Sequence, residues 1–185
     1  MLVGHINLDR SFNGTGEHFV ALVEALDRMG VRQHVIVKNE SLAKRLRLYR
    51  HVTVGPTTGA PVVAYCLMPQ VDVVHAHDER SGQAGLLLTL TRSMPYVLTR
   101  RRKMQPARNP VMKSVYSRAA GIVCTTDAGA RALSKYDASV QVDVINDIAR
   151  GSADDFDAAR DRIAAEHLRI YHRAADSSRV PAMLL

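Results

Sequence analysis

The chain has 185 residues, of which 46% are hydrophobic and 23% are charged, and its formal net charge is +7. This length accommodates one well-buried domain but not two full α/β domains, and the composition is that of a globular protein rather than a disordered one. No stretch approaches the roughly 20 apolar residues of a membrane span, and the first residues lack a signal-peptide pattern, so we expect a cytoplasmic protein.

The positive charge favours an anionic partner, and nucleic acid, anionic lipid and sugar-nucleotide phosphates all qualify. Nucleic acid is the weakest of these, because tryptophan is absent and no basic segment carries interleaved aromatic residues. The two cysteines, Cys66 and Cys124, lie in apolar surroundings without a metal-ligand spacing. We expect both to be buried free thiols.

The first segment predicts a strand, a glycine loop and a helix. The strand is expected over residues 2–7, and apolar residues recur at helical spacing over residues 19–29 before Gly30 ends the helix. Gly14-Thr15-Gly16-Glu17 between them is a candidate phosphate-binding loop, because glycines let backbone N–H groups approach an anion at a helix N-terminus. The Gly-x-Gly-x-x-Gly pattern is incomplete, since Phe19 replaces the third glycine, and simple turn glycines are the alternative.

A strand over residues 33–38 precedes a basic helix over residues 40–50. Its basic side chains are Lys44, Arg45, Arg47 and Arg50. This pattern fits an amphipathic helix on an anionic membrane surface, and the alternative is a surface helix with a solvated basic face. A short strand over 51–54 and a helix that opens at Pro61 follow.

Residues 71–80 contain the predicted functional edge of the domain. A short apolar run leads into His75, His77 and Asp78, which is typical of a buried strand in a parallel sheet that runs into a helix, here over residues 83–92. The two histidines are two residues apart and therefore share one side of the strand. Ligands of such sheets bind beyond the carboxyl ends of the strands, although hydrogen-bonding at a strand end is the alternative role. A metal needs a third ligand that the sequence does not indicate, so we expect none.

The second half of the chain continues the alternation of predicted strands and helices. A strand over 96–99 leads into a basic loop that begins at Arg100, and we expect at least one of its side chains to face the cleft. Helices over 111–120 and 127–135 alternate with strands over 121–125 and 140–145. A long amphipathic helix then runs from Ser152, in a capping-box pattern, to Asp176.

These elements predict a single Rossmann-like α/β domain of about seven mostly parallel strands. Residues 1–150 form this domain, and residues 151–185 form a helix and tail that pack on it. The long helix is amphipathic and must bury its apolar stripe, which we expect to pack back on the same domain.

Four segments occur in a fairly specific order and spacing: 14–17 with its helix, 72–77, 117–126 and 142–148. With them the chain resembles the N-terminal half of a family-4-like glycosyltransferase of the GT-B fold. The final helix, with Tyr171, is similar to the C-terminal helix of such enzymes, which crosses back onto the N-terminal domain.

The resemblance implies transfer of a sugar from a nucleotide sugar to a glycan or lipid-linked acceptor, with no cofactor and no metal. In the family the N-terminal domain holds the acceptor, its glycine loop approaches the donor diphosphate, and a strand-end histidine lies near the transferred sugar. This assigns Gly14-Thr15-Gly16 to the loop and His77 to the catalytic position. His75, Asp78 and Arg100 are the further candidates for binding donor phosphate or acceptor.

The chain also departs from the family. Glu166 is the only glutamate after Glu79, so the Glu-x7-Glu motif of the donor domain is missing, and Thr99 is followed by Arg100 where the family often has histidine. We therefore expect half of a retaining-type GT-B enzyme in polysaccharide or glycolipid synthesis, completed by a partner glycosyltransferase chain or a second copy. The alternatives are a non-catalytic acceptor-binding scaffold at the inner membrane face and an unrelated Rossmann-like nucleotide binder.

Overall fold

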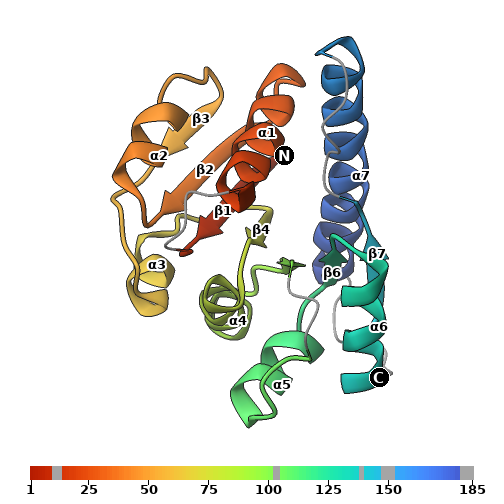
Figure 1. Cartoon of the computed structure of the whole chain (residues 1–185). Coiled ribbons are helices and arrows are strands. Elements are labelled where there is room, and N and C mark those ends of the chain that lie inside the picture. The colour runs from red at the N-terminus through yellow and green to blue at the C-terminus, as the bar shows by residue number, and fades with distance from the viewer. Residues whose placement is uncertain (10–13, 102–104, 138–139, 147–152, 180–185) are drawn as a thin grey trace.

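The computed structural model describes residues 1–9, 14–101, 105–137, 140–146 and 153–179 (Figure 1). Within these ranges seven strands alternate with seven helices. The strands are β1 (Leu2–Asn7), β2 (Arg32–Val37), β3 (Val52–Val54), β4 (Val73–Ala76), β5 (Tyr96–Arg100), β6 (Gly121–Cys124) and β7 (Val142–Val144). The helices are α1 (Gly14–Arg28), α2 (Glu40–Leu46), α3 (Pro61–Leu67), α4 (Glu79–Arg92), α5 (Pro110–Ser117), α6 (Asp127–Tyr136) and α7 (Ala153–Arg179).

The strands form one sheet in the order β3-β2-β1-β4-β5-β6-β7, and each described pair of neighbouring strands is parallel. The predicted Rossmann-like sheet is therefore confirmed, and its described pairs are all parallel rather than mostly so. The chain builds outward from β1 through β2 and β3, then returns to place β4 on the other side of β1. The order of the strands thus reverses between β1 and β4, and ligands of doubly wound sheets bind at the carboxyl edge of this switch point.

Helices cover both faces of the sheet. The two residues Val73 and His75 of β4 face α1 and α7, whereas Val74 and Ala76 face α4, because successive side chains of a strand point to opposite faces. Figure 1 shows α1 and α7 as neighbours, and α7 also contacts β4 and β5. The prediction that a long C-terminal helix packs back on the sheet is confirmed.

The basic helix is shorter than predicted. It ends at Leu46, and Arg47 is its C-cap, so Arg50 lies outside the helix. Leu48, just beyond this end, is 83% exposed and buries nothing. The backbone instead turns so that the carbonyl of His51 accepts a hydrogen bond from the amide of Gln33 at 2.8 Å, where β2 and β3 begin to pair.

The prediction of two buried cysteines is wrong for one of them. Cys124 is buried in β6, but Cys66 is exposed on α3. The reason is that α3 buries only Ala64 completely and leaves the side that carries Val62 and Val63 open to solvent. The predicted capping box at Ser152 lies outside the described residues.

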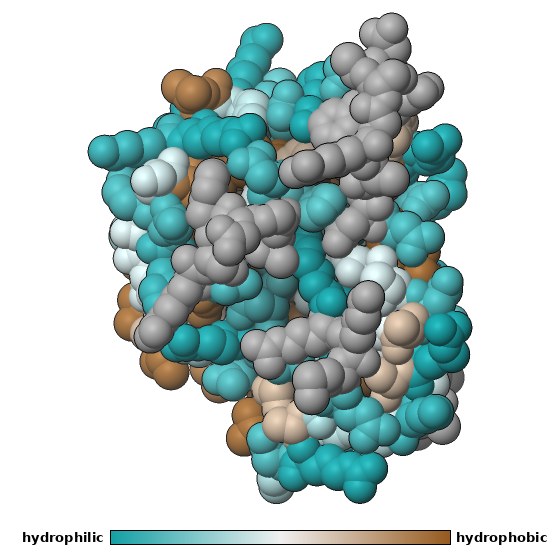
Figure 2. All heavy atoms as spheres, viewed as in Figure 1, coloured by the Kyte–Doolittle hydropathy of each residue, from teal (hydrophilic) through white to brown (hydrophobic). Residues whose placement is uncertain are grey.

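None of the described helices is long and apolar enough to cross a membrane. On the face drawn in Figure 2 hydrophilic residues predominate and the apolar ones form separate groups. Among the residues whose burial is described, the large exposed apolar side chains are Met29, Leu48, Val62, Val63, Leu90, Val111 and Val144.

Candidate functional site at the carboxyl edge of β1 and β4

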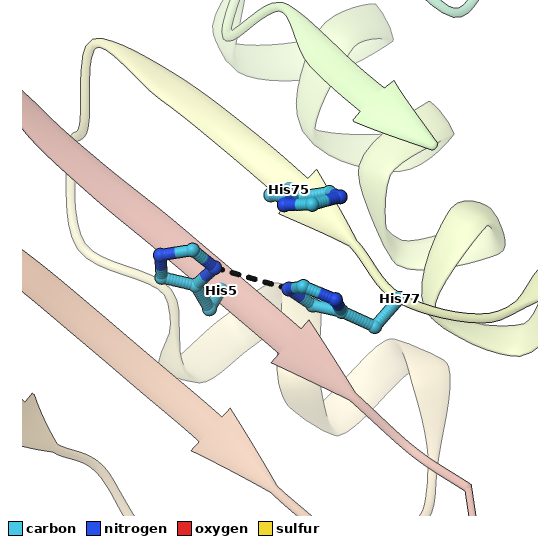
Figure 3. A group of neighbouring side chains, drawn as sticks. All are labelled: His5, His75 and His77. Atoms are coloured by element: carbon cyan, nitrogen blue, oxygen red, sulfur yellow. Dashed lines mark hydrogen bonds between the residues drawn. The ribbon is translucent and has the colours of Figure 1, made fainter. Parts of the chain in front are cut away.

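Three buried histidines meet at the switch point of the sheet. His5 of β1 is the register partner of His75 of β4, and His77 lies two residues after His75, directly after the end of β4. The amide of His77 still donates to the carbonyl of Ile6 at 2.9 Å, which extends the pairing by one step. The two-residue period of a strand therefore places all three imidazoles on one face of the sheet (Figure 3). Helices α1 and α7 pack on that face.

Hydrogen bonds hold these rings in place. His5 Nδ1 and His77 Nε2 share a hydrogen bond of 3.0 Å, the dashed line of Figure 3. His75 uses both ring nitrogens: Nδ1 lies 2.6 Å from the hydroxyl of Tyr171, and Nε2 lies 2.6 Å from the hydroxyl of Thr99. His75 is thus anchored to α7 and to β5, whereas His77 has one ring nitrogen, Nδ1, without a partner among the described residues.

Burial keeps these imidazoles neutral. It lowers the pKa of His5 to about 3, with a further lowering from the nearby His167, and it lowers the pKa of His75 and of His77 well below 6.5. Burial also lowers the pKa of His167 on α7 to about 4, although its hydrogen bond of 2.8 Å from Nδ1 to the carbonyl of Ile163 opposes the shift. At neutral pH the rings therefore offer lone pairs and N–H groups rather than positive charge.

A pocket opens beside this cluster. It encloses about 430 Å³ including its open mouth, and α1, the strand ends and α7 form its walls. Its polar lining includes two guanidinium groups, from Arg101 and Arg160, together with histidines, threonines and an asparagine. None of the described residues that line it is acidic, which suits an anionic ligand.

The predicted glycine segment lies at the same edge of the sheet as His77. Gly14-Thr15-Gly16 forms the first turn of α1 rather than a separate loop. One turn further on, the ring of Phe19 packs edge-on against the ring of His77 at a centroid distance of 4.5 Å, and His18 lines the pocket. The first turn of a helix presents backbone N–H groups that have no partner within the helix, and these suit an anion.

Asp78 and Arg100 occupy different surroundings from each other. The Asp78 carboxylate caps α4 and accepts the amide of Leu8 at 2.8 Å, which joins the ends of β1 and β4. The buried Arg100 donates from Nε to the hydroxyl of Tyr116 at 3.0 Å and lies 3.9 Å from a carboxylate oxygen of Glu79. The next residue, Arg101, is the one that lines the pocket, and it donates to the carbonyl of His77 at 3.4 Å.

The four basic residues around α2 do not line this pocket. Arg45 forms an ion pair with Glu17 at 3.2 Å, and Arg47 forms one with Glu40 at 3.0 Å. The remaining two, Lys44 and Arg50, are exposed. Part of the predicted basic surface is therefore neutralised by neighbouring carboxylates.

Sequence reasoning did not single out four residues of this site: His5, His18, Arg101 and His167. The signal for His167 was its position in the apolar stripe of the last helix, and Arg101 belonged to the basic run after β5. His5 was visible as a histidine inside an apolar strand. Its proximity to His77 depends on the sheet order, which no local pattern reveals.

Comparisons with known proteins bear on this arrangement. The family model of Glycosyltransferase Family 4 matches residues 12–147. Among solved structures, Anabaena Alr3699/HepE in complex with UDP has a TM-score of 0.58 and 14% sequence identity, with 88% of this chain and 50% of that chain covered. The structure of the same protein with UDP and glucose has a TM-score of 0.58 and 13% sequence identity, with 84% of this chain and 48% of that chain covered. Its structure with UDP-glucose has a TM-score of 0.56 and 14% sequence identity, with 88% of this chain and 50% of that chain covered.

This chain therefore spans about half the length of the solved structures that it resembles, and the resemblance shows a shared fold. A sequence comparison with curated proteins gave no match.

Proposed function

The chain belongs to glycosyltransferase family 4, and we propose that it forms one wall of a cleft in which a nucleotide sugar gives its sugar to a glycan or glycolipid acceptor. The observation that supports this most is the pocket at the switch point, whose described lining combines two guanidinium groups with neutral histidines and contains no acidic residue. HepE, whose fold is similar, is bound to UDP and UDP-glucose in its structures.

The proposed reaction breaks the bond between the sugar C1 and the diphosphate oxygen and forms a bond from C1 to the acceptor hydroxyl oxygen. The acceptor hydroxyl gives its proton to the departing diphosphate oxygen, and the protonated diphosphate leaves as an anion. Such catalysis depends on holding both substrates together and on stabilising the negative charge of the leaving group. We assign the charge stabilisation to Arg101 and the first turn of α1, because a guanidinium and helix N–H groups both bind phosphate.

We assign His77 to the sugar or to the acceptor hydroxyl. Its ring lines the pocket, and Nδ1 has no partner among the described residues, so this atom can exchange a hydrogen bond with a substrate hydroxyl. His75 lines the same pocket, but both of its ring nitrogens already bond to hydroxyl groups, so we assign it to positioning. Asp78 holds the ends of β1 and β4 together through its bond to Leu8.

A sugar-transfer cleft of the GT-B type needs a second wall that binds the donor nucleotide. We propose that a further domain or a partner chain supplies this wall, and that a second copy of this chain is one such partner. Sedimentation of the purified protein, alone and with candidate partner glycosyltransferases, tests whether the cleft is completed in this way.

Nucleotide binding tests the assignment of the pocket. Calorimetric titration of the assembly of this chain with its second wall, using UDP, GDP and ADP, is expected to show binding of at least one nucleotide, and Arg101→Gln is expected to weaken it at least about tenfold, because a charge-assisted hydrogen bond contributes about 1.5–3 kcal/mol. The matched control is Arg32→Gln, since Arg32 is exposed and begins β2 at the opposite edge of the sheet. Equal weakening by both variants would contradict the assignment.

A radiolabelled nucleotide-sugar assay with the assembled partner then tests the transfer itself. His77→Gln is expected to reduce turnover more than it reduces nucleotide affinity, because we assign His77 to the sugar or the acceptor hydroxyl and not to the nucleotide.

A non-catalytic acceptor-binding protein is the second candidate, and the exposed basic residues Lys44, Arg47 and Arg50 favour it. Co-sedimentation with anionic and neutral vesicles separates the two functions. Binding to anionic vesicles without any nucleotide binding would favour the scaffold.

A further inference from the structure

The histidine cluster has the composition of a metal site. One ring nitrogen from each of His5, His75 and His77 lies within 4.8 Å of the others, and all three rings are buried. The sequence showed two histidines on one strand and no third ligand, but the fold brings His5 to them from β1, in register with His75 (Figure 3). The three donors thus come from two adjacent strands that hydrogen bonds hold in place.

The ring nitrogens are incompletely satisfied without a ligand. His5 Nδ1 and His77 Nε2 share one proton, and the outer atoms, His5 Nε2 and His77 Nδ1, have no hydrogen-bond partner among the described residues. The outer atoms lack a partner whichever of the two inner nitrogens carries the proton, because the hydrogen bond between the rings uses only the inner nitrogens. A buried polar atom without a partner costs about 1–3 kcal/mol, and these outer atoms are the ones that carry the N–H groups once a cation binds the two inner nitrogens.

We propose that His5, His75 and His77 bind one divalent transition-metal ion, of which zinc is the best match. A cation would replace the shared proton between His5 Nδ1 and His77 Nε2, which lie 3.0 Å apart. Two ligands at the usual Zn–N distance of about 2.0–2.1 Å are separated by about 3.3 Å in tetrahedral geometry. A shift of a few tenths of an ångström therefore converts the hydrogen bond into coordination.

Groups around the cluster suit this role. A metal-bound imidazole normally donates its other N–H to a neighbouring oxygen. The buried Gln33 Oε1 has no partner and lies near enough to His5 to favour its protonated form, although the two are not aligned as a hydrogen bond. His75 has a hydroxyl on each ring nitrogen, from Tyr171 and Thr99, so it can exchange one for the metal and keep the other as an orienting partner.

The donor set selects the class of metal. Imidazole nitrogens suit zinc, copper, nickel and iron, whereas magnesium and calcium require oxygen ligands. Three histidines leave a fourth position for water or another ligand, and His75 and His77 both line the pocket. The nearby charge of Arg101 opposes a cation, so we expect weaker binding than at a cysteine-rich structural site.

Cobalt binding tests the proposal on the full chain without an affinity tag and without nucleotide. We expect Co²⁺ to bind at one ion per chain with the visible absorption of a four-coordinate site, and zinc to displace it and raise the melting temperature. His5→Gln should weaken Co²⁺ binding at least about tenfold, because one of three protein ligands is lost. His172→Gln, on the exposed side of α7, is the control and should leave binding unchanged.

Nuclear magnetic resonance of ¹⁵N-labelled histidine keeps the test decisive if His5→Gln does not fold. Zinc should then shift the ring resonances of three histidines of the wild-type protein together. No cobalt or zinc binding, or binding that His5→Gln leaves intact, would overturn the proposal. Since no nucleotide is present, this outcome is independent of the nucleotide titrations that test the sugar-transfer function.

Discussion

The hydroxyl of Tyr171 on α7 lies 2.6 Å from Nδ1 of His75 in the middle of the sheet. Both groups are completely buried, and the two residues are 96 positions apart in the chain. This bond ties the last helix to the floor of the pocket, so the stability of the fold and the orientation of the site depend on the same pair.

Replacing Tyr171 by phenylalanine should therefore destabilise the protein. The variant leaves Nδ1 of the buried His75 without a partner, which should lower the free energy of unfolding by about 1–3 kcal/mol. Urea denaturation measures this loss. Tyr65→Phe is the matched control, because the hydroxyl of Tyr65 makes an exposed hydrogen bond to Thr91 and its loss should change stability little. Equal losses of unfolding free energy in the two variants would show that the buried bond to His75 stabilises the protein no more than an exposed hydrogen bond does.

The metal-free protein should lose stability as the pH falls below 6.5. Burial lowers the pKa of His5 to about 3 and of His167 to about 4, so the unfolded chain binds protons at a pH where the folded chain does not. Stability is then complete above pH 6.5 and decreases as the pH falls towards these values, by about 1.4 kcal/mol per pH unit for each such histidine.

Urea midpoints at pH 7.5, 6.0 and 5.0 in the presence of a chelator measure this dependence. His75 and His77 add to it, because burial and the charge of Arg101 also lower the pKa of each. Most carboxylates titrate below this window, so the slope reports mainly on histidine. A midpoint that stays constant from pH 7.5 to 5.0 would mean that the rings are accessible to protons in the folded state.

Adding a single methyl group at Gly85 should disrupt the packing of α4 on the sheet. A Cβ atom there would lie 2.8 Å from two ring atoms of Tyr96, whose hydroxyl is held by the carbonyl of Val115. We expect Gly85→Ala to destabilise by about 1–3 kcal/mol, even though alanine favours a helix over glycine by about 1 kcal/mol. Gly59→Ala is the control, because its Cβ would meet only the flexible side chain of Lys38. Thermal melting of both variants distinguishes the two environments.

Removal of α7 should prevent stable folding. The helix buries Ile170, Tyr171 and Ala174 against the sheet, over strand residues that include Val97 and Val123. A chain that ends at residue 152 would expose this apolar face to water, at about 25 cal/mol for each Å². Circular dichroism and size-exclusion chromatography should show loss of structure or aggregation. A monomeric, cooperatively folded truncation would contradict this role of the helix.

The sequence predicted the order of strands and helices because each buried strand is a short apolar run and each helix has an apolar period. β1 has the predicted bounds, and Gly30 adopts the positive φ of 72° that suits a helix terminator. The end of α2 was missed because the apolar spacing continues through Tyr49, while the pairing of β3 with β2, a long-range effect, ends the helix earlier.

The sequence predicted only part of the candidate site, because the rest depends on long-range pairing. His75 and His77 could be recognised from one strand, whereas His5 joins them only through the pairing of β1 with β4. Within the basic run after β5, the burial of Arg100 against Tyr116 and the position of Arg101 at the pocket depend on where the strand ends. A run of adjacent arginines carries no signal that distinguishes these two positions.

The pairing of β1 with β4 also has a kinetic consequence. Contacts between residues about 70 positions apart, such as His5 and His75, require the closure of a long loop, and such contacts slow the folding of a chain. A nascent or partly folded molecule that has formed only one side of the sheet lacks the clustered imidazoles. Any ligand that needs all three rings would consequently select completed molecules, and its binding would serve as a direct signal that the two sides of the sheet have joined.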